Sequence, residues 1–263
     1  MTWKIQSLKG KPNLSNPIFI EGLPGIGNVG KVVVDFIVDE LNATKLCEFF
    51  SYSLPHSVFV NEDNLVELPK IELFYKKMKG KNDLLLLAGD IQPADEVSTY
   101  EFCETVLDTL KGFNVKEIIT LGGIGLPEIP KKPKVYYTGN SKKIVKQYKH
   151  TLLHNDLYGV VGPIVGVSGL FLGLAAKRKI DAVAMLAETY GHPLYLGVKG
   201  AREILKVLDE RLKWGINLDK LEKEIEDIED EMVRRTKELG DVSKQTAIKK
   251  LKGKLGGDVS YIG

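Results

Sequence analysis

Short hydrophobic runs along the first third of the chain predict a series of strands with one helix among them. The strands fall at residues 17–22, 44–50, 56–60, 67–77 and 83–90. Between the first two, apolar residues at helical spacing over 27–41 predict a helix that packs on the first strand. The run at 83–90 is apolar almost throughout, which is typical of a strand in a sheet that is covered on both faces.

The pattern continues with alternating helices and strands. A helix over 95–112 and a strand over 115–123 make 83–123 a β-α-β unit, and such crossovers join parallel strands. Residues 122–134 are rich in Gly and Pro, so we expect a loop there. Further elements are a strand at 135–138, a short basic helix at 141–149, a strand, turn and helix within 160–179, a buried strand at 181–188 and an amphipathic helix at 201–214. This order predicts an α/β fold with a mixed, mostly parallel sheet and flanking helices.

The composition changes near residue 216. Apolar residues then recur at heptad-like spacing on a charged segment, at Leu218, Leu221, Ile225, Ile228, Met232 and Leu239. Such a narrow stripe is too small to form a core, so this helix should pack against its own domain or another chain. The glycine-rich end predicts a mobile tail. We therefore divide the chain into a core domain at 1–215, a helical extension at 216–240 and a tail at 241–263.

Composition and charge exclude several classes of protein. The 263 residues are 43% hydrophobic with a formal net charge of +2, which supports a sizeable core and gives no bias toward nucleic acid or a membrane surface. Cys47 and Cys103 lie in apolar patterns and are predicted core residues; two cysteines are too few for a disulfide framework, which fits a reduced, cytoplasmic setting. We find no signal-peptide pattern and no apolar run of transmembrane length.

Gly25, Gly27 and Gly30 form the pattern GxGxxG between the first strand and the first helix, as in a dinucleotide-binding loop. Two features argue against a nucleotide. Pro24 stiffens the turn, and Glu48, the only nearby acidic candidate for a ribose contact, lies in the middle of a strand. We favour a tight strand-to-helix connection, with a nucleotide-binding loop as the alternative.

Other glycines recur at predicted strand ends, at 89–90, 122–125 and 162–169. The carboxyl ends of strands in open α/β sheets are the usual ligand crevice, so we expect a pocket there, although the same glycines also serve turn geometry. Glu188, Tyr190 and His192 follow a buried strand. They either line this crevice, or Glu188 and His192 orient a loop.

The sequence holds no assembled catalytic set. His150 and His154 are four residues apart but lack the glutamate of a zinc-protease helix. Ser168 is not in a GxSxG elbow, because its neighbouring glycines have the wrong offsets. Asp90 and Asp95 are candidates to cap the helix that begins near residue 95. We therefore predict no catalytic residue, no cofactor and no metal.

Four segments carry a combination that is specific as a set: FIEGLPGIGNVGKVVVDFIVDEL, LLLLAGDIQP, IITLGGIGLPEIPKKPKVYYTGN and GPIVGVSGLFLGLAAKRKIDAVAMLAETYGHP. Together they resemble the archaeal members of the proteasome assembly chaperone family, over roughly residues 15–215. The resemblance implies an α/β fold like that of the nucleoside phosphorylases, without their catalytic residues. It also implies homo-oligomers that bind proteasome α-subunits. Members of this family have sometimes been labelled ATP-grasp or carboxylate–amine ligase proteins.

Some members of that family end in a hydrophobic residue, Tyr and any residue, and this tail docks between α-subunits. Here the last residues are Val259, Ser260, Tyr261, Ile262 and Gly263, so that the Tyr is third from the end and follows a Ser. A tyrosine on a mobile tail offers apolar area and one hydrogen bond to a partner. The tail is therefore either a direct contact with the partner or a free end.

With this resemblance, we expect a non-enzymatic proteasome assembly chaperone or proteasome-binding adaptor. It would act as a homo-oligomer on α-subunits or the 20S core particle. The candidate partner-binding residues are the five of the tail and four of the heptad-like stripe, Leu221, Ile225, Ile228 and Met232. The alternative is a small-molecule binding protein or ligase-like enzyme that uses the Gly25–Gly30 loop.

Overall fold

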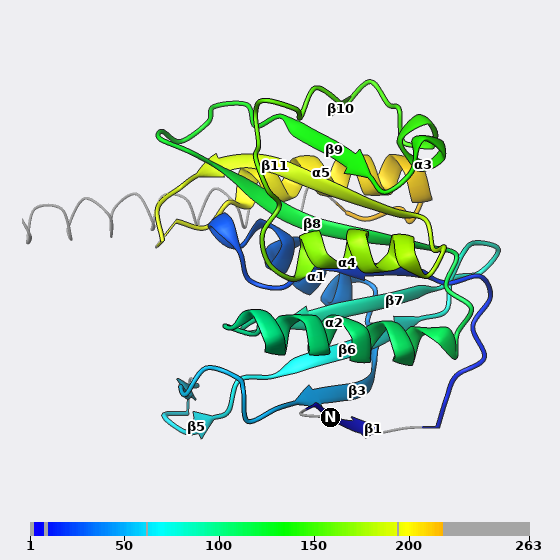
Figure 1. Ribbon diagram of the computed structural model, residues 1–263, viewed down its shortest axis with the longest axis vertical. Coiled ribbons are helices and arrows are strands. Elements are labelled where there is room, and N and C mark those ends of the chain that lie inside the picture. The colour runs from blue at the N-terminus through cyan, green and yellow to red at the C-terminus, as the bar shows by residue number, and fades with distance from the viewer. Residues whose placement is uncertain (1–2, 8–9, 62, 194, 218–263) are drawn as a thin grey trace, which may run out of the picture. The chain divides into compact units, whose positions relative to one another are not determined.

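The computed structural model describes residues 3–7, 10–61, 63–193 and 195–217. Four parallel strands form the centre of its nine-stranded sheet, in the order β7, β2, β8, β11 (Figure 1). Their bounds are β2 (Ile18–Glu21), β7 (Leu84–Gly89), β8 (Glu117–Leu126) and β11 (Ala182–Tyr190). Every residue of β2 and β7 is buried, as expected for strands with helices on both faces.

Antiparallel strands extend the sheet on both sides of this centre. Beyond β7 lie β6 (Ile71–Lys76), β3 (Thr44–Phe50) and β1 (Lys4–Ser7), each antiparallel to its neighbour. Beyond β11 lies β9 (Val135–Gly139) in antiparallel pairing, and β10 (Leu153–His154) then pairs with β9 in parallel. The predicted mixed sheet is confirmed, but it is not mostly parallel: four of its pairings are parallel and four are antiparallel, with three of the parallel ones in the centre.

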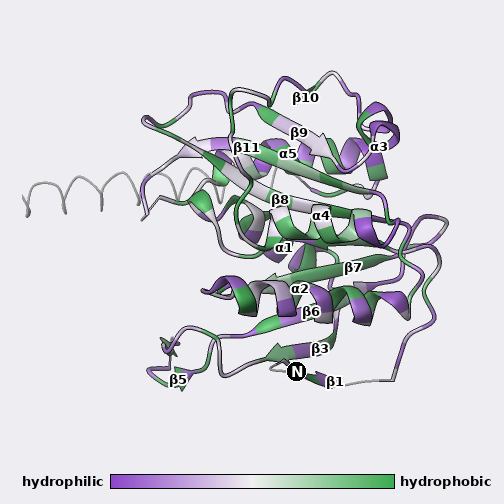
Figure 2. Cartoon of the chain, in the orientation of Figure 1, coloured by the Kyte–Doolittle hydropathy of each residue, from purple (hydrophilic) through white to green (hydrophobic). Residues whose placement is uncertain are grey.

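Helices cover both faces of the sheet. On one face α1 (Val29–Glu40) packs against α5 (Val198–Leu212), and on the other α2 (Glu96–Lys111) packs against α4 (Val167–Lys177) (Figure 1). Figure 2 shows how the hydrophobic residues follow the central strands and the inner sides of these helices. A short helix, α3 (Lys142–Gln147), follows β9. No helix in the described part of the chain is long and apolar enough to cross a membrane.

The crossover connections bring the carboxyl ends of the central strands to one edge. The predicted unit at 83–123 appears as β7–α2–β8, but its two strands do not touch, because β2 lies between them. The chain leaves β2 through α1 toward β3 on one side of the sheet, and leaves β7 through α2 toward β8 on the other. Such a switch in direction opens a crevice outside the carboxyl ends of the strands.

The structure corrects two predicted segments. Residues 122–126 continue β8 and are not a loop. The glycines in this part of the strand leave room for the backbone of neighbouring segments. A Cβ on Gly123 would collide with the backbone oxygen of Ile26, and one on Gly125 would lie 3.2 Å from Cα of Gly191. The strand predicted at the start of 160–179 is also wrong, since only an isolated bridge joins Tyr158 and Val161 there.

The strand predicted at 56–60 is reduced to two residues outside the main sheet. It is β4 (Phe59–Val60), which pairs with β5 (Val66–Glu67) as a separate antiparallel ribbon. The predicted helical extension and tail fall on 216–263, of which only Ile216 and Asn217 are described. These two parts of the chain stay predictions.

Candidate functional site

A cavity of about 940 Å³, here called the crevice, opens at the carboxyl ends of the central strands. The predicted glycine segments at 122–125 and 162–169 both contribute to its lining, together with Gly25 and Gly30. The predicted pocket is therefore present. Gly89 and Asp90, at the end of β7, do not line it.

Glu21 is the fully buried carboxyl group of this crevice, at the last position of β2. Its Oε1 accepts a hydrogen bond of 2.9 Å from the backbone N–H of Leu23, and its Oε2 accepts one of 2.8 Å from the hydroxyl of Ser168. Burial raises the pKa of Glu21 to about 7, although both hydrogen bonds act in the opposite direction. The sequence analysis did not single out this residue; the signal was an acidic residue inside the apolar run IFIEG.

Gln92 is a second polar group that joins the walls of the crevice. Its side-chain Nε2 donates to the backbone oxygen of Pro24 at 2.7 Å, and its Oε1 accepts from the N–H of Val167 at 3.3 Å. The turn before α1 is thus tied to the start of α4 through one amide. Both Gln92 and Glu21 form hydrogen bonds to other groups of the protein, which favours a structural role for them.

The glycines of the GxGxxG pattern mostly face protein atoms. A Cβ on Gly30 would lie 2.5 Å from the backbone oxygen of Leu121, and one on Gly27, whose φ is 61°, would lie 2.6 Å from Oγ1 of Thr189. Only Gly25 of the three would place a Cβ in open space. These contacts favour the interpretation of the pattern as a tight strand-to-helix connection.

The charge of the crevice does not suit a phosphate. The ionisable side chains among its described lining residues are acidic or phenolic: Glu21, Asp95, Glu96 and Tyr100. Asp95 caps α2 as predicted, accepting from the N–H of Ser98 at 2.9 Å. Asp90 is not a cap. It accepts instead from the backbone N–H of Lys70 at 3.1 Å.

β11 runs on to Tyr190, so Glu188 and Tyr190 belong to the strand and only His192 follows it; none of the three lines the crevice. Glu188 accepts from the backbone N–H of Lys134 at 2.9 Å and so fixes the loop before β9. The ring of His192 stacks on that of Tyr190 at 5.6 Å. Of the two readings of this segment, loop orientation is the one that the contacts of Glu188 support.

The two cysteines and the histidines His150 and His154 have different surroundings. Cys47 and Cys103 are both buried free thiols, as predicted, and burial raises the pKa of Cys47 to about 11. His150 lies 3.4 Å from Glu210, whereas His154 lies beside the ring of Tyr136. Within the described residues, His, Cys, Asp and Glu side chains form no cluster of three that could hold a metal ion.

The predicted partner-binding residues lie outside the described part of the chain. They are Leu221, Ile225, Ile228 and Met232 of the heptad-like stripe, and Val259, Ser260, Tyr261, Ile262 and Gly263 of the tail. Their role in binding a partner is a proposal.

Comparison with known proteins identifies the fold family. The model of the PAC2 family matches residues 19–235. Among solved structures, Pyrococcus furiosus PbaB, an archaeal proteasome activator, is 30% identical, with a TM-score of 0.80 over 90% of this chain and 100% of that chain. Pyrococcus furiosus PbaA, an archaeal homolog of proteasome-assembly chaperone, is 23% identical; its TM-score of 0.72 over 96% of this chain and 99% of that chain shows a shared fold.

Sequence relatives match a similar share of the chain. Two uncharacterised proteins of Methanocaldococcus jannaschii are each 29% identical to this chain. The first aligns over 82% of this chain and 81% of its own length, and the second over 85% and 87%. The family match at 19–235 takes in the described helices and every strand of the main sheet except β1 and the first residue of β2.

Proposed function

Since this chain belongs to the PAC2 family, we propose that it is a non-enzymatic proteasome assembly chaperone or proteasome-binding adaptor. The observation that carries the proposal is the likeness to PbaB, a proteasome activator, over that protein's full length at 30% identity. The crevice supports a non-enzymatic role, because two of its polar side chains already bond to other groups of the protein. Glu21 is held by Ser168 and Leu23, and Gln92 bonds to two backbone groups.

We further propose that the protein works as a homo-oligomer on proteasome α-subunits, in the cytoplasm. The helix at 216–240 and the tail at 241–263 would carry part of the contact, through the apolar stripe and Tyr261. Several copies of one tail on one oligomer would bind a ring of identical subunits more tightly than a single tail, because each later contact is intramolecular. The two buried, free cysteines agree with a reducing compartment.

The nucleotide-binding alternative receives less support. A phosphate group needs backbone N–H groups or cations that face it. Gly27 and Gly30 instead pack against Thr189 and Leu121, and the described lining of the crevice supplies no lysine or arginine. We therefore keep the adaptor role as the proposed function.

Peptide hydrolysis by an archaeal core particle tests this proposal. If the protein is an activator, its addition to finished particles should raise the rate of hydrolysis. If it is an assembly chaperone, it should speed the formation of active particles from separate α- and β-subunits, with no effect on finished ones. A truncated chain that ends at residue 216 is the control. No effect of the full chain in either assay would contradict the proposed function.

A further inference from the structure

The ribbon formed by β4 and β5, here called the apolar ribbon (residues 58–68), exposes large hydrophobic side chains on both of its faces. Val60 is 66% exposed and Val66 is 69% exposed. The other exposed members are Val58, Phe59, Leu65 and Leu68. Successive residues of a strand point to opposite faces, so the exposure of both Phe59 and Val60 leaves neither face covered. Figures 1 and 2 show the ribbon standing apart from the main sheet, with hydrophobic residues at β5.

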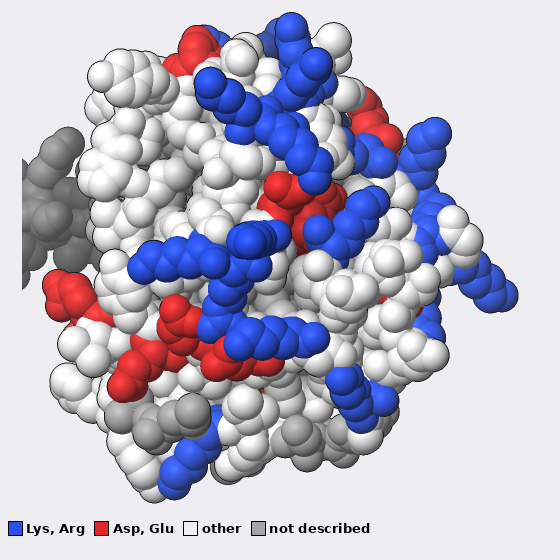
Figure 3. Space-filling model, turned by 45° about the vertical axis from the view of Figure 1, so that its right-hand side comes forward, with Lys and Arg blue, Asp and Glu red and all other residues white. Residues whose placement is uncertain are grey.

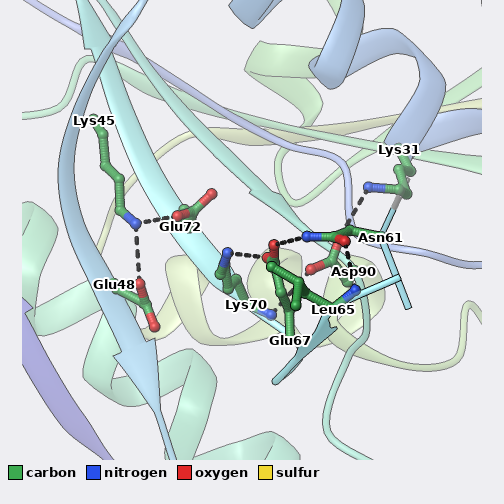
Figure 4. A network of polar contacts seen from close by, with 9 residues as sticks. All are labelled: Lys31, Lys45, Glu48, Asn61, Leu65, Glu67, Lys70, Glu72 and Asp90. Carbon is green, nitrogen blue, oxygen red and sulfur yellow. Dashed lines mark hydrogen bonds and ion pairs between the residues drawn. The ribbon is translucent and has the colours of Figure 1, made fainter. Parts of the chain in front are cut away.

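Polar contacts hold the apolar ribbon in shape (Figure 4). At its turn, Oδ1 of Asn61 accepts from the backbone N–H of Leu65 at 2.9 Å, and its Nδ2 donates to Glu67 at 2.8 Å. Glu67 also pairs with Lys70 at 2.6 Å, and the backbone N–H of Lys70 donates to Asp90. The ribbon is thus anchored to the end of β7 and is preorganised for contact.

A ribbon of this kind requires a cover. Two-stranded hairpins are at best marginally stable in water unless another strand or helix packs on them. Within the described residues, the ribbon pairs with no third strand. Contiguous exposed apolar patches on otherwise ordinary proteins mark interaction sites. Because the ribbon is already ordered, docking would cost little conformational entropy.

The charge around the apolar ribbon specifies what should cover it. Between Leu46 and Pro69 the sequence has no lysine or arginine, in a chain that has 37 of them. The same stretch holds four acidic residues, Glu48, Glu62, Asp63 and Glu67. The flanking Lys45 and Lys70 pair with Glu48 and Glu67, so the acidic excess of this part of the sequence is two charges. The complementary surface would therefore be a groove with apolar walls and a basic rim.

A groove with a basic rim lies on this chain beside α3, lined by Tyr137 and Val145 and by the polar Asn140, Ser141 and Asn155, and we call it the α3 groove. It is a cavity of about 480 Å³. Three lysines, Lys142, Lys146 and Lys149, also line it. Figure 3 shows lysine and arginine side chains gathered on this side of the molecule. By contrast, the crevice is acidic, and in the cavity beside Trp214 the cation of Arg211 already stacks on Tyr148.

The two surfaces cannot meet within one chain. In Figure 1 the apolar ribbon lies at the lower left and α3 at the upper right, across the width of the sheet. The ribbon of one copy can reach the α3 groove only on a second copy. A contact between two different surfaces of identical chains is heterologous, and it closes into a ring when the rotation between copies allows it.

We propose that the apolar ribbon of one copy docks in the α3 groove of a second copy. This inference rests on the proposed function, because it names the contact that would build the proposed homo-oligomer. The oligomer would then have a head-to-tail arrangement, in which the apolar ribbon of each subunit docks in the α3 groove of the next subunit.

Light scattering after size-exclusion chromatography tests this contact on the full-length protein. The ribbon variant is Val60→Asp with Val66→Asp, and the groove variant is Lys142→Glu with Lys146→Glu. All four side chains are exposed, so circular dichroism and the melting temperature should stay close to those of the wild type. Val97→Asp on α2, where the valine is 70% exposed, is the matched control and should keep the wild-type mass.

We expect each variant alone to fall from the wild-type oligomer to a monomer. A mixture of the two should form dimers, because the ribbon variant keeps an intact groove and the groove variant keeps an intact ribbon. An oligomer that survives both sets of substitutions would overturn this contact but leave the homo-oligomer standing. A monomeric wild type would overturn both the contact and the proposed oligomer, while peptide hydrolysis would still test the role on the proteasome separately.

Discussion

Ser168 donates its hydroxyl hydrogen to Oε2 of Glu21 across 2.8 Å, and so joins the first turn of α4 to the carboxyl end of β2. The two residues are 147 positions apart in the sequence. Oε1 of the same carboxyl group accepts from the N–H of Leu23, two residues along the chain. One buried side chain therefore holds together three segments that border the crevice.

Replacement of Ser168 by Ala should lower the free energy of unfolding by about 1–3 kcal/mol, because a buried acceptor loses its partner. Urea denaturation followed by circular dichroism measures this change. Ser57→Ala is the matched control, since Ser57 is exposed, and it should stay within about 0.5 kcal/mol of the wild type. A loss for Ser168→Ala as small as that of the control would show that Glu21 does not depend on this bond.

The buried carboxyl of Glu21 should make stability depend on pH. Its pKa is raised from 4.5 to about 7 in the folded protein, so the folded state holds the proton more strongly than the unfolded state. The stabilisation from protonation is fully present below pH 4.5 and is lost as the pH rises through about 7. The shift corresponds to about 3 kcal/mol at most.

Comparison with Glu21→Gln isolates this effect, because glutamine keeps the shape and cannot ionise. Between pH 5 and pH 8 we expect the wild type to lose stability relative to the variant, as measured by urea denaturation at each pH. A constant difference between the two proteins over this range would contradict the raised pKa.

Two glycines of the GxGxxG pattern should respond differently to the same change. Gly30→Ala should cost about 1–3 kcal/mol, since its Cβ would lie 2.5 Å from the backbone oxygen of Leu121. Gly25→Ala should cost less than about 0.5 kcal/mol, because no atom lies within 4 Å of its Cβ and its φ is −155°. Thermal unfolding compares the two. Equal costs would contradict the packing role assigned to this pattern.

A panel of nucleotides and nucleosides should leave the melting temperature unchanged. A ligand at about 100 times its dissociation constant would add roughly 2.7 kcal/mol to the free energy of unfolding. Differential scanning fluorimetry detects a shift of that size readily. A reproducible rise in melting temperature with one compound, absent in Gly25→Trp but present in Val97→Asp, would show that the crevice binds a ligand.

Local patterns in the sequence predict the central strands well. They fail where the local structure depends on contacts with residues that are distant in the sequence. The strand predicted at 44–50 matches β3, and 83–90 matches β7 to within one residue at each end, because apolar runs bounded by polar residues need no other information. The composition predicts a loop at 122–134, whereas β8 continues to Leu126. Its glycines serve the close approach of Ile26 and Gly191, which no local pattern reveals.

Local patterns likewise predict the position of the candidate site but not the contacts within it. The position of the crevice follows from the order of strands and helices, which places glycine-rich strand ends at one edge of the sheet. The pairing of Glu21 with Ser168 joins residues that are distant in sequence and carry no shared motif. The sequence predicts separate strands at 56–60 and 67–77 and does not indicate the exposed apolar ribbon, because exposure depends on what packs above a strand and not on its composition.

Native mass spectrometry of the full chain mixed with archaeal α-subunits and with assembled core particle tests the proteasome role most directly. Two truncated chains, one lacking Gly257–Gly263 and one lacking residues 217–263, complete the experiment. We expect the full chain to form a complex that is weakened without the last seven residues and lost without the whole extension. The absence of any complex between the full chain and either proteasome species would contradict the proposed function.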